Sequence, residues 1–463
     1  MGKRLYESYN ISPERTEQLG IQELAVLSQS DDELQYRAVS QKYFSKEKAI
    51  CPTCGGRKTR VSKIVTRKVK DILPVPNEKG SVIDLAFDQR YYKCCDCGNR
   101  VFPEEITFAE PGCRYSNRLS DLLAEGTLTH SYSKVCAHYG VPASKTSVGV
   151  IMRRIFRQRW GKLPPLKTPI TLSVFMVEYF GYSYPVIMNV ADDGVYFIDI
   201  LEESSEAAYQ TFFSQFEANE VQRIFADADE QLISASSSSF PQAKIVMTDE
   251  CLLRYVKSAF SEIIDDEGKY CGVPHRINAF TSRKQYLASG EKRRVQRALE
   301  TRPRLRAAYN AYQELLIRIE APWTVNTIIQ WIDQLPEYLA DETPDGKTLP
   351  ELQEFDIVKT ILEMYKPLFE GYLAMDNKPP ANYASCISGI SDAVANMPCC
   401  IYDVLRARMT LNSPYITETV NDRTYRIGIP VDALIQSMNE ITYKIMEERD
   451  NYGYQSEDST GWN

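Results

Sequence analysis

Residues 170–204 read ITLSVFMVEYFGYSYPVIMNVADDGVYFIDILEES, and this stretch decides the fold class of the chain. It contains three runs rich in β-branched and aromatic residues, separated by turn-forming residues such as Gly181 and Gly194. Short runs of this composition between turn residues predict β-strands. We therefore expect three strands that follow one another as hairpins.

A helix and two further strands are expected after these three strands. Residues 205–220 (SEAAYQTFFSQFEANE) favour a helix, whereas residues 221–229 (VQRIFADAD) and 243–250 (AKIVMTDE) each favour a strand. Helical periodicity resumes at residues 252–260 (LLRYVKSAF). Three hairpin-linked strands followed by alternating helices and strands predict an α/β domain with a ribonuclease H-like sheet.

The charge of the chain is unevenly distributed. The 463 residues carry a net charge of −8, and 43% are hydrophobic and 25% charged, as in ordinary soluble globular proteins. Residues 51–167, however, contain 21 Lys and Arg against 10 Asp and Glu, a net charge of +11, so the rest of the chain carries −19. A basic segment attached to an acidic body is expected when one part of a protein faces phosphate groups.

The N-terminal sequence MGKRLYESYN has no apolar core of a signal peptide, and no later stretch approaches the ~18 apolar residues that a membrane span needs. We therefore expect a cytoplasmic protein with no membrane partner. In a reducing compartment, the 12 cysteines are better interpreted as metal ligands or buried thiols than as disulfides.

Two CxxC pairs predict a structural zinc site. They are Cys51-Pro-Thr-Cys54 and Cys94-Cys-Asp-Cys97, with strand-like sequence between them. A tetrahedral zinc ion takes four thiolates at ~2.3 Å, and a CxxC turn lets both of its sulfurs reach one ion. Such a Zn²⁺ site is closed and leaves no position for catalysis. The alternative is a set of free or buried thiols, and Cys95 leaves the choice of ligand in the second pair open.

Residues 129–151 (THSYSKVCAHYGVPASKTSVGVI) have the pattern of a helix-turn-helix. Ala137 would let the two helices approach each other, and Gly140 would supply the turn. The second helix would then present its first residues to base edges of double-stranded DNA, and the arginines after them to phosphates. The expected DNA-binding residues are Ser144, Lys145, Thr146, Ser147, Arg153, Arg154 and Arg157.

Two alternatives to this DNA-binding interpretation remain open. The segment could be an ordinary helical hairpin whose basic face is solvated. A second basic stretch, which begins with Lys292-Arg293-Arg294 and continues through Arg297, is equally compatible with a solvated face and with DNA contact.

The sequence predicts a multidomain α/β chain. Residues 161–169 (GKLPPLKTP) form a Pro-rich linker and the clearest boundary. The expected parts are a helical segment at 1–50 (with helices in 11–24 and 31–44), a zinc ribbon at 51–110, the helix-turn-helix domain at 111–160, the linker, a ribonuclease H-like domain at 170–256, a helical insertion at 257–380, and at 381–463 the last part of the ribonuclease H-like domain with C-terminal helices.

This order of parts resembles the ISL-three-type transposases of bacterial insertion sequences, over roughly residues 40–420. The echoes are CPTCG (51–55), QRYYKCCDCGNRVFPEE (89–105), HYGVPASKTSV (138–148) and FPQAKIVMTDE (240–250). The resemblance implies a mechanism in which three carboxylates hold two Mg²⁺ ions for the cleavage and joining of DNA. It also implies a bacterial, nucleoid-associated location and a possible homodimer.

The positions that the resemblance makes catalytic are mostly substituted. The first aspartate of the family motif falls on Val177, and the last carboxylate falls on Ser388. Only the second aspartate, Asp227, is present. Glu178 is adjacent to the first lost position, but neighbours on a strand point to opposite faces. Asp392 lies one helical turn after Ser388 and is the better substitute.

The fifth-strand motif of the family is also altered. Asp249 is present, but Cys251 and Leu252 stand where the family has an aromatic residue and a histidine. Asp227 and Asp392 are therefore the candidate catalytic residues.

We interpret the chain as a DNA-binding protein of transposase descent that has lost strand transfer. The enzymatic alternative is an active transposase with relocated carboxylates, which would need Mg²⁺. A third interpretation treats the ribbon as a protein-interaction module, and the basic charge of residues 51–167 argues against it. Metal-dependent nicking of a terminal repeat would separate the first two.

Overall fold

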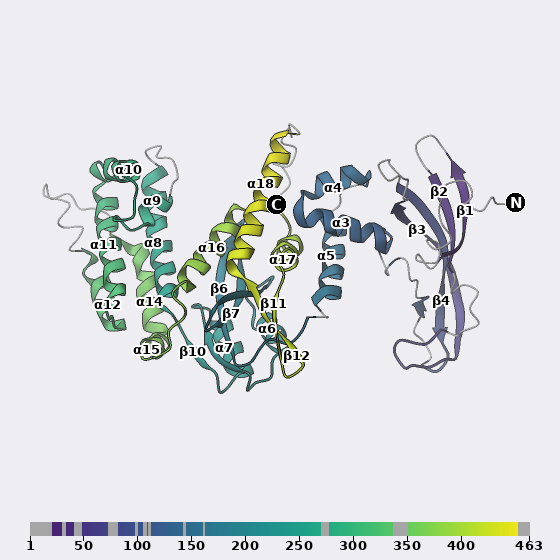
Figure 1. The fold of residues 1–463 in the computed structure, drawn as a ribbon, viewed down its shortest axis with the longest axis horizontal. Coiled ribbons are helices and arrows are strands. Elements are labelled where there is room, and N and C mark those ends of the chain that lie inside the picture. The colour runs from purple at the N-terminus through teal and green to yellow at the C-terminus, as the bar shows by residue number, and fades with distance from the viewer. Residues whose placement is uncertain are drawn as a thin grey trace. The chain divides into compact units, whose positions relative to one another are not determined.

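The computed structural model describes the chain as two compact units (Figure 1). The described residues are 21–29, 34–40, 49–72, 82–97, 101–104, 109, 113–141, 145–160, 163–269, 277–336 and 351–451. The first unit comprises residues 1–163, 396–413 and 436–463, and the second comprises residues 164–395 and 414–435. Among the described residues, no helix has both the length and the apolar character needed to cross a bilayer.

The first unit opens with a five-stranded sheet whose order is β1-β2-β4-β3, with β5 paired to β4. Its longest ladder joins β3 and β4 in antiparallel register from Thr59 opposite Cys94 to Ile72 opposite Val82. Both CxxC turns therefore lie at the same end of this ladder. The strands are β1 (Ile21–Gln29), β2 (Leu34–Ser40), β3 (Thr59–Ile72), β4 (Val82–Cys94) and β5 (Val101–Pro103).

Strands β1 and β2 correct the prediction of helices in residues 1–50. Along β2, apolar Leu34 and Tyr36 alternate with polar Gln35 and Arg37, which is the period of a strand. The backbone of β2 pairs with β1 on one side and with β4 on the other. Pairing with a distant strand thus overrides the helix-favouring composition, and the N-terminal strands share one sheet with the ribbon. The remaining predicted helical residues lie outside the described part of the chain.

Three helices follow the sheet in the first unit. Ser116 and Ser131 cap the first two helices, and the second ends at Gly140, which has a left-handed backbone with φ of 64°. The third helix begins at Lys145, and the three residues before it lie outside the described residues, so the helix-turn-helix stays a prediction. The helices are α3 (Asn117–Thr129), α4 (Tyr132–Tyr139) and α5 (Lys145–Trp160).

The predicted role of Ala137 in this turn is wrong, because its side chain is exposed. Val135 and Cys136 are the buried residues of α4. The close approach is made by Gly126 of α3, where an added Cβ would lie 2.8 Å from a methyl group of Val135.

The second unit contains a seven-stranded sheet with the order β10-β9-β6-β7-β8-β12-β11. β6, β7 and β8 form the predicted antiparallel hairpins, and β9 and β10 run parallel to β6. This confirms the α/β class and the ribonuclease H-like sheet. The strands are β6 (Ile170–Tyr179), β7 (Tyr182–Ala191), β8 (Gly194–Ile200), β9 (Val221–Phe225), β10 (Lys244–Val246), β11 (Ile416–Val420) and β12 (Arg423–Pro430).

The hairpin of β11 and β12 extends the sheet beyond β8, and the sequence did not predict it. β12 pairs with β8 through Ile429 opposite Phe197. The segment expected as a linker also contacts β12, because Arg426 donates its backbone N–H to Pro165 and Lys167 donates to Arg426. The division between the two units falls between residues 163 and 164.

Helices connect the strands of the second sheet and pack against them. α6 (Glu206–Phe213) precedes β9, and α7 (Glu230–Ser239) lies between β9 and β10. α16 (Tyr383–Asn396) contacts the sheet at its first residue, where the Tyr383 hydroxyl is 2.8 Å from Ser173 Oγ of β6. α17 (Tyr402–Leu411) belongs to the first unit, and α18 (Val431–Asn451) begins in the second unit and belongs to the first from Gln436 onward.

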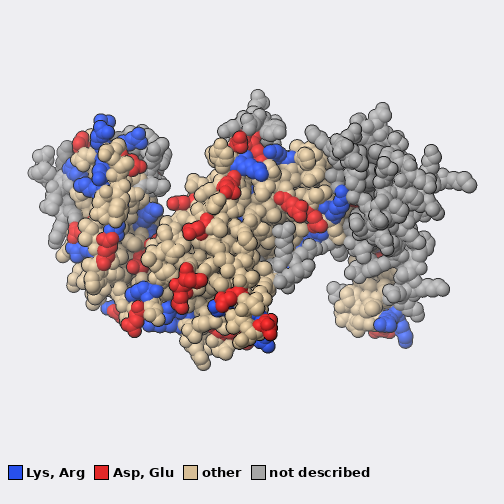
Figure 2. Space-filling view, in the orientation of Figure 1, with Lys and Arg blue, Asp and Glu red and all other residues tan. Residues whose placement is uncertain are grey.

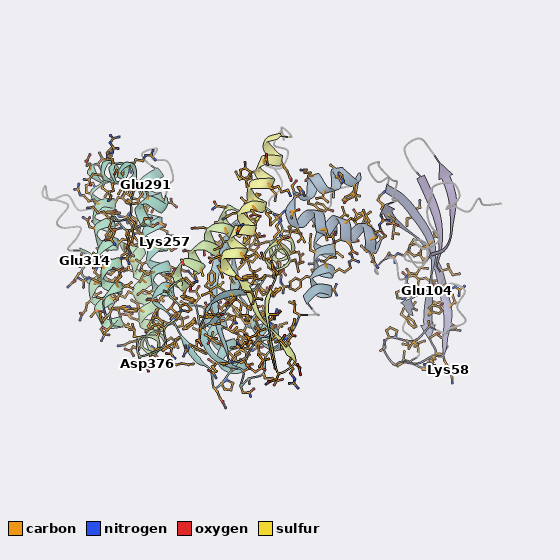
Figure 3. The ribbon with its side chains drawn as sticks, in the orientation of Figure 1. Lys58, Glu104, Lys257, Glu291, Glu314 and Asp376 are labelled. Carbon is orange, nitrogen blue, oxygen red and sulfur yellow. The ribbon has the colours of Figure 1, made fainter. Side chains whose placement is uncertain are left out.

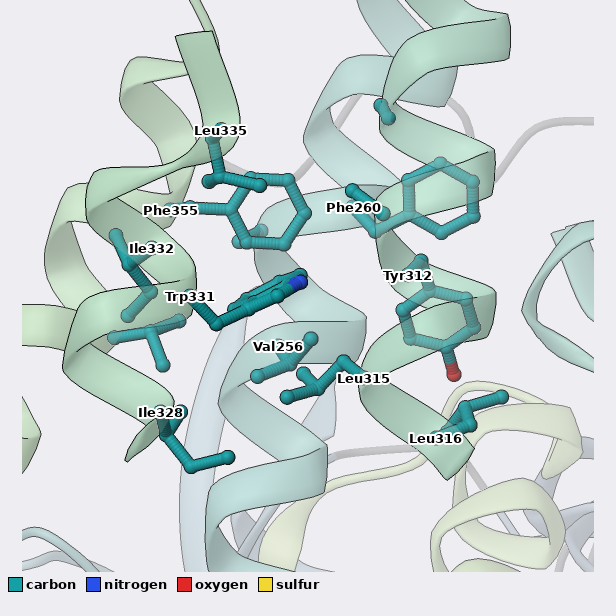
Figure 4. Packing of buried hydrophobic residues seen from close by; sticks show 14 of the residues in the cluster. Val256, Phe260, Tyr312, Leu315, Leu316, Ile328, Trp331, Ile332, Leu335 and Phe355 are labelled. Carbon is teal, nitrogen blue, oxygen red and sulfur yellow. The ribbon is translucent and has the colours of Figure 1, made fainter. Parts of the chain in front are cut away.

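A helical region follows β10 and has its own apolar core. The predicted boundary at residue 257 lies inside α8, so the helical region begins at Asp249. In the core, Trp331 contacts Phe355 edge to face, and Phe260 stacks on Tyr312 (Figure 4). Its elements are α8 (Asp249–Lys269), α9 (Ile277–Thr281), α10 (Ser289–Glu300), α11 (Pro303–Glu320), α12 (Val325–Asp333), η2 (Gln353–Phe355), α14 (Asp356–Met364) and α15 (Lys366–Leu373).

Candidate functional sites

Four cysteines of the ribbon converge on one point. Cys51 and Cys54 precede β3, and Cys94 and Cys97 lie at the end of β4. Their four Sγ atoms are all within 4.8 Å of one another, with 3.7 Å between Cys51 and Cys97 and 3.6 Å between Cys54 and Cys94. A tetrahedron of thiolates at ~2.3 Å from zinc has edges of ~3.8 Å, so the four sulfurs already have the spacing of a zinc site.

The backbone of the first turn explains why these side chains converge. Gly55 adopts φ of 69°, a left-handed conformation that glycine reaches without a steric penalty. The turn is closed because Gly55 donates to the carbonyl of Cys51 and Cys51 donates to the carbonyl of Gly56, each at 2.9 Å. Cys95 instead bonds through its backbone N–H to the carbonyl of Lys58, at 2.8 Å, and its side chain is exposed. Lys58 is labelled at this end of the sheet in Figure 3.

The thiols of this cluster shift one another's pKa values in opposite directions. Backbone N–H groups of Cys54 and Thr53 donate to the Cys51 sulfur and lower the pKa of that thiol to about 6. The hydrogen bond with Cys94 raises the pKa of the Cys97 thiol to about 12. A bound metal would favour the thiolate form of all four. Among the described residues, this is the one group of three or more His, Cys, Asp or Glu side chains that could hold a metal ion.

Asp227 lies directly after β9, at the carboxyl edge of the second sheet, where the resemblance places the catalytic centre. Its side chain is 1% exposed. Two backbone groups donate to the carboxylate, Met176 N–H at 3.0 Å to Oδ2 and Ala228 N–H at 3.1 Å to Oδ1. The strand therefore positions this carboxylate as the sequence predicts, but in a fully enclosed setting.

A guanidinium occupies the remaining approach to this carboxylate. Nη2 of Arg254, one helical turn into α8, lies 2.5 Å from Asp227 Oδ2. The guanidinium also lies over the ring of Phe175, 5.6 Å from its centroid. Although burial opposes the charged form, Asp227 holds the pKa of Arg254 above its ordinary value. Arg254 thus supplies the positive charge that a metal ion would supply in an active site.

The thiol of Cys251 closes the opposite side of the carboxylate. Its Sγ is 3.3 Å from Asp227 Oδ1. Burial, together with the nearby negative charge of Asp227, raises the pKa of the Cys251 thiol well above its ordinary value, so the group stays protonated and donates. Both carboxylate oxygens are therefore engaged by donors from the protein itself.

The two substituted catalytic positions provide no carboxylate near Asp227. Val177 of β6 is buried, and Glu178 beside it is exposed, as expected for neighbours on a strand. Ser388 and Asp392 are both exposed on α16. Asp392 is nine residues beyond Tyr383, where α16 meets the sheet, which corresponds to ~13 Å along a helix axis at ~1.5 Å per residue.

Two other acidic residues of this edge hold the backbone in place. Asp229 caps α7, where its Oδ1 accepts from Gln231 N–H at 2.9 Å and its Oδ2 from the Tyr209 hydroxyl at 2.7 Å. Asp249 begins α8 and accepts from the Tyr372 hydroxyl at 2.9 Å. Each carboxylate is thus already engaged in a structural contact.

A pair of Mg²⁺ ions does not fit these residues. Hard divalent cations need several anionic or neutral oxygen ligands at ~2.0–2.1 Å. Asp227 offers one carboxylate whose oxygens are already bonded, and no group of three or more acidic, His or Cys ligands among the described residues includes Asp227 or Asp392. Binding of even one ion would require Arg254 to leave.

The predicted DNA-binding residues lie in and just before α5. Lys145, Thr146 and Ser147 are the first three residues of this helix, and Ser144 lies outside the described residues. Further along, Arg153 and Arg157 are exposed, and Arg153 pairs with Asp403 of α17 at 3.2 Å.

Arg154 is placed differently from the prediction. It is 5% exposed and forms an ion pair with Asp121 of α3, and its Nη2 donates to the carbonyl of Asn117 at 3.1 Å. Because α5 turns this residue toward α3, it joins the two helices and is not available to a phosphate.

α17 adds residues to the apolar core of α3, α4 and α5. This contact was not predicted from the sequence. Val404 and Ala407 of α17 belong to the same apolar core as α3, α4 and α5. Arg408 donates to the carbonyls of Thr127 and His130, at the end of α3, where helix carbonyls have no partner within the helix.

α18 contributes one buried acidic side chain to the turn between α3 and α4. Glu448, 8% exposed, forms ion pairs with His130 and Lys134 and accepts from the backbone N–H of Ser131. Although burial opposes ionisation, the hydrogen bonds from His130 and Lys134 hold the pKa of Glu448 below its ordinary value.

Three residues of these sites were not predicted from the sequence: Arg254, Arg408 and Glu448. A signal for Arg254 exists, because it lies three residues after Cys251 and four after Glu250 in a stretch with helical period. A charged residue beside the apolar face of such a helix needs a partner of opposite charge.

The comparisons with known proteins agree with the resemblance of the motifs. Residues 180–347, from the β6–β7 turn through α12, match the model of a family described as Transposase. No curated protein is similar enough to the chain to count as a match. Together with the four-cysteine cluster ahead of a ribonuclease H-like sheet, this match over part of the chain agrees with the predicted resemblance to the ISL-three-type transposases.

Proposed function

We propose that the chain binds duplex DNA as a zinc-containing member of the transposase family and does not carry out strand transfer. The observation that carries the second half of this proposal is the buried ion pair of Arg254 and Asp227. A two-metal reaction needs carboxylates that fix both ions ~3.5–4 Å apart. Here the one retained carboxylate is neutralised by an arginine.

The substituted positions support the same conclusion. Valine at position 177 cannot bind a cation, and the hydroxyl of Ser388 donates within its own helix to the carbonyl of Ser385. The carboxylates of Glu178 and Asp392 are exposed, and those of Asp229 and Asp249 already accept hydrogen bonds from tyrosine hydroxyls. This argues against the alternative, an active enzyme with relocated ligands.

The DNA-binding half of the proposal rests on α5 and on charge. The N-terminal residues of α5, from Ser144 to Ser147, would reach base edges in the major groove, and Arg153 and Arg157 would contact phosphates. Arg154 is not among the proposed phosphate contacts, because its side chain is buried. The net charge of +11 in residues 51–167 provides the sequence-independent attraction.

Zinc is the proposed occupant of the four-cysteine site. Cys51, Cys54, Cys94 and Cys97 would hold it, and a four-thiolate site serves folding because it has no open position. Duplex DNA is the proposed partner. The predicted homodimer is tested by sedimentation of the full chain with and without DNA.

Two measurements on the full chain test the proposal. In the first, duplexes selected from a randomised pool are bound by the wild type, by Lys145→Ala and by Arg157→Ala. We expect Lys145→Ala to change the preferred sequence, and Arg157→Ala to weaken all sequences alike. An unchanged preference in Lys145→Ala would remove α5 from recognition.

The second measurement is a cleavage and joining assay with the selected duplex and Mg²⁺ or Mn²⁺. We expect neither nicking nor joining. Robust strand transfer by the wild type that disappears in Asp227→Ala would show that the ion pair opens and that the chain is an active transposase.

A further inference from the structure

α10 carries a dense group of cations in a part of the chain that the proposed function does not use. Its sequence is SGEKRRVQRALE, and Lys292, Arg293, Arg294 and Arg297 are all exposed. Figure 2 shows the Lys and Arg atoms gathered over this helix, at the upper left of the view. Glu291, labelled in Figure 3, belongs to the first turn, where its Oε2 accepts from the backbone N–H of Ala288.

The helical period places the arginines on one face. Val295 and Leu299 are the buried residues of α10 and anchor it to the apolar core. At ~100° per residue, Arg293 and Arg297 lie one turn apart on the side opposite these two, and Arg294 lies beside them. We call Arg293, Arg294 and Arg297 the arginine face of α10.

The arginine face has no acidic partner among the described residues. No carboxylate there lies within ion-pair distance of these side chains, and Arg293 makes only a long bond of 3.4 Å from Nε to the carbonyl of Ser289. Several other cations of the same helical region do have acidic partners. Arg304 contacts Glu354 at 2.6 Å, and Arg318 contacts Glu314 at 2.5 Å.

The charge is local and unusual for this part of the chain. Residues 283–306 contain nine Lys and Arg against two Asp and Glu, a net charge of +7. The residues outside 51–167 carry −19 in total, so a strongly basic helix stands in an acidic surrounding. Like charges one turn apart destabilise a helix, and this repulsion is relieved when a polyanion binds.

We propose that the arginine face of α10 binds the phosphate backbone of duplex DNA and forms a second DNA contact, separate from α5. This inference rests on the proposed DNA-binding function. Guanidinium groups form paired hydrogen bonds to phosphate oxygens and are the preferred side chains for such contacts. DNA is favoured over other polyanions because α10 lies within residues 180–347, which match the transposase family.

The test compares two variants of the full chain that lose the same charge. One replaces the arginine face (Arg293→Gln, Arg294→Gln and Arg297→Gln). The control replaces three cations that have acidic partners in the same helical region (Arg318→Gln, Lys359→Gln and Lys366→Gln). Affinity for a random-sequence duplex is measured against salt concentration by fluorescence anisotropy, and thermal melting checks that both variants fold.

We expect the arginine-face variant to reduce the magnitude of the slope of log K against log salt concentration by about 2.7. Each of the three lost phosphate contacts contributes ~0.9 to this slope. The control should keep the wild-type slope. An equal change in both variants, or an unchanged slope in the arginine-face variant, would overturn the proposal for α10. If the wild type itself does not bind the duplex, the proposed DNA-binding function fails.

A cross-link gives a second, independent readout. Gln296 is exposed and lies between Arg293 and Arg297 in the sequence, so a photoreactive amino acid placed there should cross-link to DNA. The same group at Thr360, on α14, should not. Absence of a cross-link at position 296 while Lys145→Ala still alters sequence preference would overturn the α10 contact and leave the α5 contact intact.

Discussion

Replacing Arg254 by methionine should strongly destabilise the second unit. The change removes the guanidinium and keeps most of the apolar volume beside Phe175. Asp227 would then be a carboxylate at 1% exposure, whose remaining donors are the N–H groups of Met176 and Ala228, the thiol of Cys251 and the hydroxyl of Tyr255. Removing one partner of a buried ion pair typically costs ~3–5 kcal/mol.

The enclosure of the carboxylate also sets a ceiling on this cost. The abandoned group can take up a proton, and protonating an ordinary aspartic acid at pH 7 costs ~4 kcal/mol at ~1.4 kcal/mol per pH unit, because it titrates near pH ~3.9. We therefore expect Arg254→Met to lose about 3–4 kcal/mol at pH 7. The loss should shrink as the pH falls toward 4, where proton uptake becomes easy.

Urea unfolding followed by tryptophan fluorescence measures this effect, because Trp323 and Trp331 both lie in the buried core of the helical region. The control is Lys257→Met, which removes a cation from the same helix without a contact to Asp227. A double variant, Asp227→Asn with Arg254→Met, should recover much of the lost stability because no charge remains buried.

Two results would refute this reasoning. One is a loss in Arg254→Met no larger than that in Lys257→Met at pH 7. The other is stabilisation of the wild type by Mg²⁺ that disappears in Asp227→Asn, since this would show that the carboxylate binds a metal despite Arg254.

Three further predictions concern other parts of the chain. Cys54→Ser should lose bound zinc and make the ribbon sensitive to protease, whereas Cys95→Ser should keep the metal. Elemental analysis of the two purified variants measures their zinc content. Zinc retained by Cys54→Ser would contradict the four-cysteine site. Burial raises the pKa of Glu250 to about 7, from an ordinary value of 4.5, so the stability that its protonated form provides is complete below pH 4.5 and is lost as the pH rises through 7. Replacing Glu250 with Gln should remove ~3 kcal/mol of that decline at ~1.4 kcal/mol per pH unit, whereas Glu262→Gln should not, as thermal melting from pH 4 to pH 8 would show. Arg408→Met should lower the free energy of unfolding by ~1–3 kcal/mol, because it leaves carbonyls at the end of α3 without donors. It should also speed hydrogen exchange in α3 and weaken DNA binding. Arg423→Met is the exposed control, and equal hydrogen exchange in the two variants would contradict the role of Arg408.

Local patterns predicted much of the second sheet. β6, β7 and β8 were readable because their apolar runs are bounded by turn residues, and β9 and β10 because each ends in polar residues that lead into a helix. β12 was not predicted, although it pairs with the adjacent β11 across a two-residue turn, Asn421 and Asp422, whose positive φ values are typical of a hairpin. Its pairing with β8 has no such local signal in the sequence.

The same limit explains the errors in the N-terminal part. The composition of β1 and β2 was interpreted as helical, but the backbone of β1 pairs with β2, and that of β2 pairs with β4, which makes both of them strands. The four cysteines were predictable because CxxC spacing fixes the geometry within each turn. That both turns meet at one point follows from the antiparallel register of β3 and β4.

The candidate catalytic site was half predictable. Motif positions showed that Val177 and Ser388 lack carboxylates and that Asp227 remains. They did not show what neutralises Asp227, because Arg254 lies on a helix that reaches the sheet only in the fold. The burial of Arg154 depends on the helical period of α5 and on the position of α3. The helical period can be read from the sequence, but the position of α3 cannot.

The completion of the α3–α5 core by α17 and α18 has a consequence for the order of events during synthesis. The ribosome makes residues 117–160 early and residues 402–451 late, with residues 164–395 of the second unit between them. Until Val404, Ala407 and Arg408 emerge, the core around α5 lacks one of its helices and the carbonyls at the end of α3 lack their donor. Chains that stop before Tyr402 would therefore lack a complete core around α5 and, under the proposed function, would not compete with complete molecules for DNA.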